Sequence, residues 1–98
     1  MQEIVLPENA IADLCRRYQV RELAVFGSFV RGNLRPDSDI DLLVEFEPDA
    51  EVGFLALARM SRELSEILHR QVDLVPKGGL KPRIKKEILD SRRILYAA

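Results

Sequence analysis

Residues 22–46 read ELAVFGSFVRGNLRPDSDIDLLVEF. The largely apolar run at residues 22–26 predicts a short strand, and Gly27 ends it because glycine adopts the backbone angles of a tight turn without steric cost. Pro36 and the polar residues beside it predict a loop. Residues 40–46 predict a second strand. We therefore expect two strands of a sheet, with a glycine turn after the first and acidic residues at the start of the second.

Hydrophobic spacing predicts the elements on either side of this segment. They are a helix over residues 7–18, one helical turn at 29–31, a helix over 52–69, a strand over 71–75, a helix that begins at Pro82, and a short strand at 93–96. The apolar face expected for the helix over 52–69 comprises Phe54, Leu57, Ala58, Leu64, Ile67 and Leu68. The buried face expected for the helix after Pro82 comprises Ile84, Ile88 and Leu89. This order predicts an α/β (α+β) layer architecture, and a length of 98 residues favours one domain over residues 1–98.

Composition and charge exclude several classes of protein. Hydrophobic residues make up 47% of the chain and charged residues 32%, as in a globular protein rather than a disordered one. The formal net charge is −1, whereas nucleic-acid-binding domains are usually strongly basic, so we expect no direct nucleic-acid binding. No apolar run approaches the roughly 20 residues that span a bilayer, and the N-terminus does not resemble a secretion signal. We expect a cytoplasmic protein without a membrane partner.

Cys15 is the one cysteine of the chain, so no intramolecular disulfide forms. It lies at helical spacing with Leu14 and Tyr18 on the apolar stripe of the first predicted helix. Free cysteine is among the most frequently buried residue types. We expect a buried structural thiol.

Two aspartates open the second strand. Because side chains alternate along a strand, Ile40, Leu42 and Val44 share one face, while Asp39 and Asp41 share the other. Two carboxylates this close repel each other unless a cation or hydrogen-bond donor compensates them. Hard oxygen ligands suit magnesium, so Asp39 and Asp41 are candidate magnesium ligands.

A third acid follows in the next predicted strand. Asp73 lies between Val72 and Leu74 and takes the face opposite to theirs. If the strands of Asp41 and Asp73 are neighbours, three carboxylates converge on one patch. That pattern suits two-metal phosphoryl transfer, in which one ion activates the nucleophile and the other holds the triphosphate. Asp39, Asp41 and Asp73 are therefore both the candidate catalytic residues and the candidate ligands of two magnesium ions.

The turn at Gly27 supplies the complementary half of such a site. Glycine allows the backbone to approach an anion closely, and the N–H groups of a following helical turn point toward phosphate oxygens. The Ser28 hydroxyl can donate to a β- or γ-phosphate oxygen. Arg31, one helical turn further on, can reach either the triphosphate or an acidic residue of the fold. Gly27, Ser28 and Arg31 are the candidate nucleotide-binding residues.

Purely structural interpretations stand beside these functional ones. Asp73 can face solvent on an edge strand, and Arg31 can form a structural ion pair. A group of basic residues follows the third predicted strand, namely Lys77, Lys81, Arg83, Lys85 and Lys86. Such a group is usually a solvated face, and the alternative is a contact with ATP phosphates or an acidic partner.

Taken together, these motifs resemble one family. The matching positions are Gly27-Ser28, Arg31-Gly32, Ser38-Asp39, Asp41 to Val44, and Val72 to Val75. In this order and spacing they resemble the minimal nucleotidyltransferases of the DNA polymerase β superfamily, the MNT or MntA-type proteins. The resemblance implies a polymerase-β-like fold with a small mixed sheet flanked by helices. It also implies that Asp39 and Asp41 bind metal, that Asp73 is the third acid, and that Gly27 and Ser28 bind triphosphate.

The resemblance further implies a partner and a reaction. Many members of the family are antitoxins that transfer AMP from ATP to a tyrosine of a HEPN-domain RNase toxin. ATP is thus the implied substrate and a HEPN-domain toxin the implied partner in a hetero-oligomer. One alternative is an antitoxin that neutralises its partner stoichiometrically, by binding alone. A second alternative is nucleotidyl transfer to a small molecule such as an aminoglycoside, which the absence of an acceptor-binding domain disfavours.

Overall fold

The computed structural model describes residues 6–27 and 39–98. Its elements are α1 (Glu8–Arg17), β1 (Val20–Phe26), β2 (Ile40–Phe46), α3 (Phe54–Leu68), β3 (Val72–Pro76), the 3-10 helix η1 (Lys77–Gly79), α4 (Pro82–Ser91) and β4 (Arg93–Ala97). Each helix or strand expected from the sequence within these residues is present, with ends that differ by a few residues. The helical turn expected at 29–31 lies outside the described residues.

The four strands form one mixed sheet in the order β3-β2-β1-β4. β1 runs antiparallel to both β2 and β4, whereas β2 and β3 are parallel. A parallel pair needs a long crossover connection, and α3 provides it between β2 and β3. The expected mixed sheet flanked by helices is confirmed.

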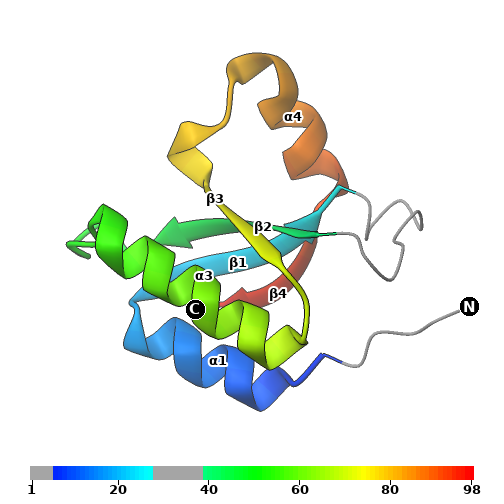
Figure 1. Ribbon diagram of the computed structural model, residues 1–98. Coiled ribbons are helices and arrows are strands. Elements are labelled where there is room, and N and C mark those ends of the chain that lie inside the picture. Colours follow the sequence, from blue (N-terminus) through cyan, green and yellow to red (C-terminus); the bar gives the residue numbers. More distant parts are fainter. Residues whose placement is uncertain (1–5, 28–38) are drawn as a thin grey trace, which may run out of the picture.

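The main core lies on the sheet face that α1 and α3 cover side by side (Figure 1). Its buried side chains include Ile11, Leu14 and Cys15 from α1, Leu23 and Val25 from β1, Ile40, Leu42 and Val44 from β2, and Met60, Leu64 and Leu68 from α3. Cys15 is fully buried, as expected, and burial raises the pKa of its thiol to about 12. Among the described residues, no helix is long and apolar enough to cross a membrane.

The apolar face expected for α3 is wrong at its N-terminal end. Phe54 is 82% exposed and Ala58 is also exposed, because the first turns of α3 run beyond the sheet. Met60, which the expected face omitted, is fully buried. Further along, two serines of α3 bind the start of β3. Ser61 donates its hydroxyl to the Val72 carbonyl oxygen at 3.1 Å, and the Val72 N–H donates to Ser65 Oγ at 3.0 Å.

The opposite face of the sheet carries η1 and α4 (Figure 1). Ala24 and Leu43 are buried there without belonging to the main core. The expected buried face of α4 is wrong, since none of its residues is fully buried and Ile84 is 45% exposed. α4 therefore covers this face loosely. After its C-terminal end, Arg92 Nε donates to Glu22 Oε2 of β1 at 2.8 Å, an ion pair that anchors the helix to the sheet.

A polar contact links α1 to α3. The Tyr18 hydroxyl donates to Glu63 Oε2 at 2.7 Å, and Arg17 Nη1 lies 3.4 Å from Glu63 Oε1. Partial burial, together with the bond to Glu63 and the charge of that carboxylate, raises the pKa of Tyr18. The same hydrogen bond and the Arg17 charge lower the pKa of Glu63. The native contact thus favours a neutral tyrosine and an ionised glutamate.

Replacement of Tyr18 by phenylalanine should lower the free energy of unfolding by about 0.5–1 kcal/mol at neutral pH, because one partly exposed charged hydrogen bond is lost. Glu63 has a lowered pKa, so its contribution is present above the unfolded pKa of about 4.3 and disappears as pH falls through the folded value. Tyr18 has a raised pKa, so its contribution is present below about pH 10 and disappears as pH rises through the folded value. Urea unfolding of wild type and Tyr18→Phe across pH measures this difference. Tyr96→Phe is the control, and an equal effect there would contradict the assignment.

Candidate active site

The structure places Asp41 and Asp73 directly opposite each other on neighbouring parallel strands. Both alternate with core residues, so both lie on the sheet face that α4 covers. The Ile40 N–H donates to the Gln71 carbonyl oxygen at 2.9 Å, so the pairing begins immediately after Asp39. The two strands are therefore neighbours, as a convergence of the acids requires.

The three acids differ in how far they are buried. Asp41 is half-buried, whereas Asp39 and Asp73 are exposed. Within residues 6–27 and 39–98, no group of three or more His, Cys, Asp or Glu side chains is close enough to hold a metal ion. The structure thus brings Asp41 and Asp73 together in register, without Asp39 completing a three-acid cluster. The donor chemistry still fits magnesium, because carboxylate oxygens from adjacent strands are its preferred ligands.

Gly27 follows β1 and lies against the carboxylate of Asp41. It follows Phe26, the register partner of Asp41, and it has a positive φ of 74°. A Cβ atom built at Gly27 would lie 2.5 Å from Asp41 Oδ2, closer than real Cβ contacts allow. The backbone angle therefore favours glycine at this position, and a Cβ atom there would push the Asp41 carboxylate aside. The other two candidate nucleotide-binding residues, Ser28 and Arg31, lie outside the described residues.

A cavity of about 460 Å³ opens between this end of the sheet and α4. Its lining residues are Phe26, Gly27 and Asp41 from the sheet side and Ile84, Glu87, Ile88 and Ser91 from α4. The volume and the mixture of apolar and polar groups are typical of a small-molecule site. Sequence reasoning missed Glu87 and Ser91, although their spacing of four residues places them on one helix face.

The comparisons with known proteins agree with this geometry. The family model described as "Nucleotidyltransferase domain" matches residues 8–95. The chain therefore belongs to the nucleotidyltransferase domain family and is a nucleotidyltransferase.

One relative and two solved structures are particularly similar. Protein adenylyltransferase MntA of Thermococcus cleftensis is 42% identical over 84 residues, which cover 86% of this chain and 81% of the relative. A chain of a toxin–antitoxin structure with AMP-PNP superposes with a TM-score of 0.76 at 24% identity, covering 95% of this chain and 75% of that one. A structure of a tri-AMPylated HEPN toxin from Shewanella oneidensis in complex with an MNT antitoxin gives a TM-score of 0.67 at 22% identity, covering 93% and 70%. The likeness to these two structures establishes the polymerase-β-like nucleotidyltransferase fold.

Substitution of alanine for Gly27 should destabilise the protein by about 1–3 kcal/mol, the usual cost of a left-handed conformation in a residue with a Cβ atom. The new methyl group should also displace the Asp41 carboxylate and reduce nucleotidyl transfer. Thermal unfolding and a transfer assay measure the two effects. Gly53→Ala is the matched control, because a Cβ atom there meets nothing within 4 Å. Wild-type stability and activity in Gly27→Ala would show that the turn tolerates a side chain.

Proposed function

We propose that this protein is the antitoxin of a toxin–antitoxin pair and a protein adenylyltransferase. It transfers AMP from ATP, in the presence of magnesium, to a tyrosine hydroxyl of a HEPN-domain RNase toxin. The observation that carries the proposal is the contact between the Gly27 turn and Asp41, beside Asp73, at a cavity of nucleotide size. The 42% identity to protein adenylyltransferase MntA supports protein as the acceptor, and the complex with a HEPN toxin supports the partner.

In this proposal one set of residues binds the phosphates of ATP, and a second set, the three aspartates, binds magnesium or accepts the proton of the acceptor hydroxyl. Gly27 lets the backbone approach the triphosphate, while Ser28 donates to a β- or γ-phosphate oxygen and Arg31 contacts the same group. Asp39, Asp41 and Asp73 are the residues that would hold two magnesium ions. Magnesium, when bound, supplies positive charge that offsets the phosphate oxygens.

The reaction exchanges one phosphorus–oxygen bond for another. The tyrosine oxygen attacks the α-phosphorus of ATP, and a new bond forms between them. The bond from the α-phosphorus to the oxygen of the β-phosphate breaks, and pyrophosphate leaves with its electron pair. Asp73 is exposed and would accept the hydroxyl proton or help to hold magnesium. We also propose that residues 1–98 act as one domain and that the partner protein supplies the acceptor tyrosine.

ATP labelled at the α-phosphate tests the proposal in the presence of magnesium and the HEPN-domain partner. Wild type should transfer label to the partner, and Asp41→Asn should transfer at least about 100-fold less, as when a group that stabilises transition-state charge is removed. Asp49→Asn, which changes an exposed aspartate in the loop after β2, should retain wild-type activity. Melting temperatures establish that both variants are folded.

The acid double variant Asp39→Asn/Asp41→Asn separates the alternatives. If it still neutralises the toxin without transferring label, the protein acts by binding alone. Label on the partner with the double variant would remove both aspartates from the mechanism. Omission of magnesium, with EDTA present, should abolish transfer by wild type.

A further inference from the structure

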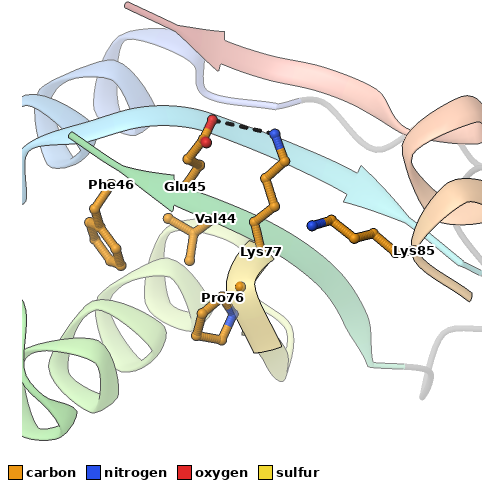
Figure 2. Close-up of a pocket in the computed structure, with 7 residues that line it drawn as sticks. Val44, Glu45, Phe46, Pro76, Lys77 and Lys85 are labelled. Atoms are coloured by element: carbon orange, nitrogen blue, oxygen red, sulfur yellow. Dashed lines mark ion pairs between the residues drawn. The ribbon is translucent and has the colours of Figure 1, made fainter. Parts of the chain in front are cut away.

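The segment formed by η1 and α4 is held to the sheet by an ion pair at each of its ends. At its start, Lys77 Nζ lies 3.6 Å from Glu45 Oε1 of β2, the contact that is dashed in Figure 2. At its end, Arg92 Nε donates to Glu22 Oε2 of β1 at 2.8 Å. Arg92 Nη1 also donates to the carbonyl oxygen of Leu89 in the last turn of α4. The segment is thus attached to two neighbouring strands.

The two carboxylates that take part in these ion pairs face each other. Glu22 and Glu45 are register partners on the antiparallel strands β1 and β2, so their side chains share the sheet face that α4 covers. Like charges directly opposite each other destabilise a sheet. The side chains of Arg92 and Glu22 are only 21% and 17% exposed, so water screens this pair incompletely. Each end of the segment therefore supplies the cation that compensates one of the two carboxylates.

Apolar packing contributes little to the attachment of α4. None of its residues is fully buried, and Ile84 is 45% exposed. Among the described elements, α1 and α3 pack closely on strands, whereas α4 packs closely on none. Besides the cavity at Asp41, a second cavity of about 420 Å³ includes Glu45, Lys77 and Lys85 in its lining. In the described part of the chain, the ion pairs at the two ends are thus the main attachments of α4.

The position of α4 determines the shape of the cavity at Asp41. Four of the seven residues that line this cavity belong to one face of α4, namely Ile84, Glu87, Ile88 and Ser91. Neither Glu22 nor Arg92 lines it. Glu22 lies four residues before Phe26 on β1, and four residues of a strand span about 13 Å. The Arg92–Glu22 pair can therefore act on this cavity only through α4.

We propose that Glu22 and Arg92 are positioning residues for nucleotide binding, because their ion pair holds α4 where the cavity at Asp41 is formed. The inference rests on the proposed function for the identity of the nucleotide, ATP. Without the pair, α4 takes a range of positions and only a fraction of the molecules has a formed cavity. The apparent affinity for ATP falls by that fraction. Bound ATP then holds α4 in place, so the turnover at saturating ATP changes little.

Equilibrium binding of α,β-methylene-ATP with magnesium tests the proposal without a partner protein, because this analogue cannot transfer AMP. Arg92→Gln should raise the Kd at least about fivefold, since it leaves the Glu22 carboxylate without its cation and reduces the fraction of molecules with a formed cavity. Arg92→Lys keeps the charge and should bind within about twofold of wild type. Arg16→Gln is the matched control, because it removes an arginine whose ion pair with Asp13 is exposed.

A second substitution should partly restore binding. An unpaired carboxylate beneath α4 is better hydrated when the helix moves away, so Arg92→Gln favours the open arrangement. Glu22→Gln/Arg92→Gln also removes this carboxylate and its repulsion of Glu45, so the double variant should bind the analogue more tightly than Arg92→Gln does. Loss of packing along the arginine side chain predicts no such recovery. A double variant that binds no better than Arg92→Gln would contradict the proposal.

Hydrogen exchange distinguishes positioning from a general loss of stability. The amides of α4 should exchange faster in Arg92→Gln than in wild type, while those of α1 and α3 stay unchanged. In wild type, raising the salt concentration from about 0.05 M to about 1 M should speed exchange in α4 more than in α1, because salt weakens partly exposed ion pairs. If Arg92→Gln only lowers the melting temperature, with the Kd and the exchange of α4 unchanged, the pair is purely structural and the proposal fails.

The transfer assay separates this inference from the proposed function. With the HEPN-domain partner, Arg92→Gln should raise the KM for ATP by the same factor as the Kd and keep kcat within about twofold of wild type. If wild type binds the analogue but transfers no label, the proposed function fails, and the binding and exchange results still decide the inference. If wild type transfers label and Arg92→Gln has an unchanged KM, the inference alone fails. If wild type binds no nucleotide, both fail.

Discussion

The parallel pairing of β2 with β3 is the interaction on which the site depends. It places Asp41 beside Asp73, and it pairs Val44 with Pro76, the residue that precedes Lys77. A parallel pair cannot be closed by a short turn, so α3 must cross the sheet to return the chain to the same edge. Ser61 and Ser65 of that helix then bond to the backbone of Val72, which fixes where β3 begins. A slip of one residue in β3 would turn Asp73 toward the core and Val72 toward solvent.

The same pairing places two acids at one end of the sheet. Asp41 and Asp73 are in register on adjacent strands, and the Asp41 carboxylate lies against the Gly27 turn, where a Cβ atom would displace it. A strand selected only for stability would not place acids at these two positions. Local conflict of this kind, within a sheet whose other positions follow the hydrophobic pattern, is typical of a functional site.

The two faces of the sheet are packed differently, and the difference suits their roles. α1 and α3 cover one face and build the main core, to which the buried Cys15 thiol belongs. α4 covers the other face without fully burying any of its own residues, and two cavities lie beneath it. The Arg92–Glu22 ion pair anchors the chain just after α4. The closely packed face thus supports the sheet, while the loosely covered face leaves room for ligands.

Short-range patterns in the sequence determined where the helices and strands lie and which individual residues carry functional groups. The alternation along residues 40–46 placed Asp41 on the face opposite to the core residues on either side of it, and Gly27 marked the turn after the first strand. Both inferences depend only on residues that are neighbours in the sequence. Helical spacing also identified the burial of Cys15. Only the tertiary structure decided that β3 pairs with β2 in the register that aligns the two acids, since pairing joins residues more than thirty positions apart.

Tertiary packing also decided that Phe54 is exposed, that Met60 is buried, and that no residue of α4 is fully buried. Hydrophobic spacing gives the direction of a helix face but does not say how far the surface beneath it extends. For the same reason Glu87 and Ser91 became lining residues of the cavity at Asp41 only when α4 was placed over the sheet. The sequence by itself therefore determined which groups the chain offers, and the tertiary structure decided which of them meet, because contact depends on packing between distant segments.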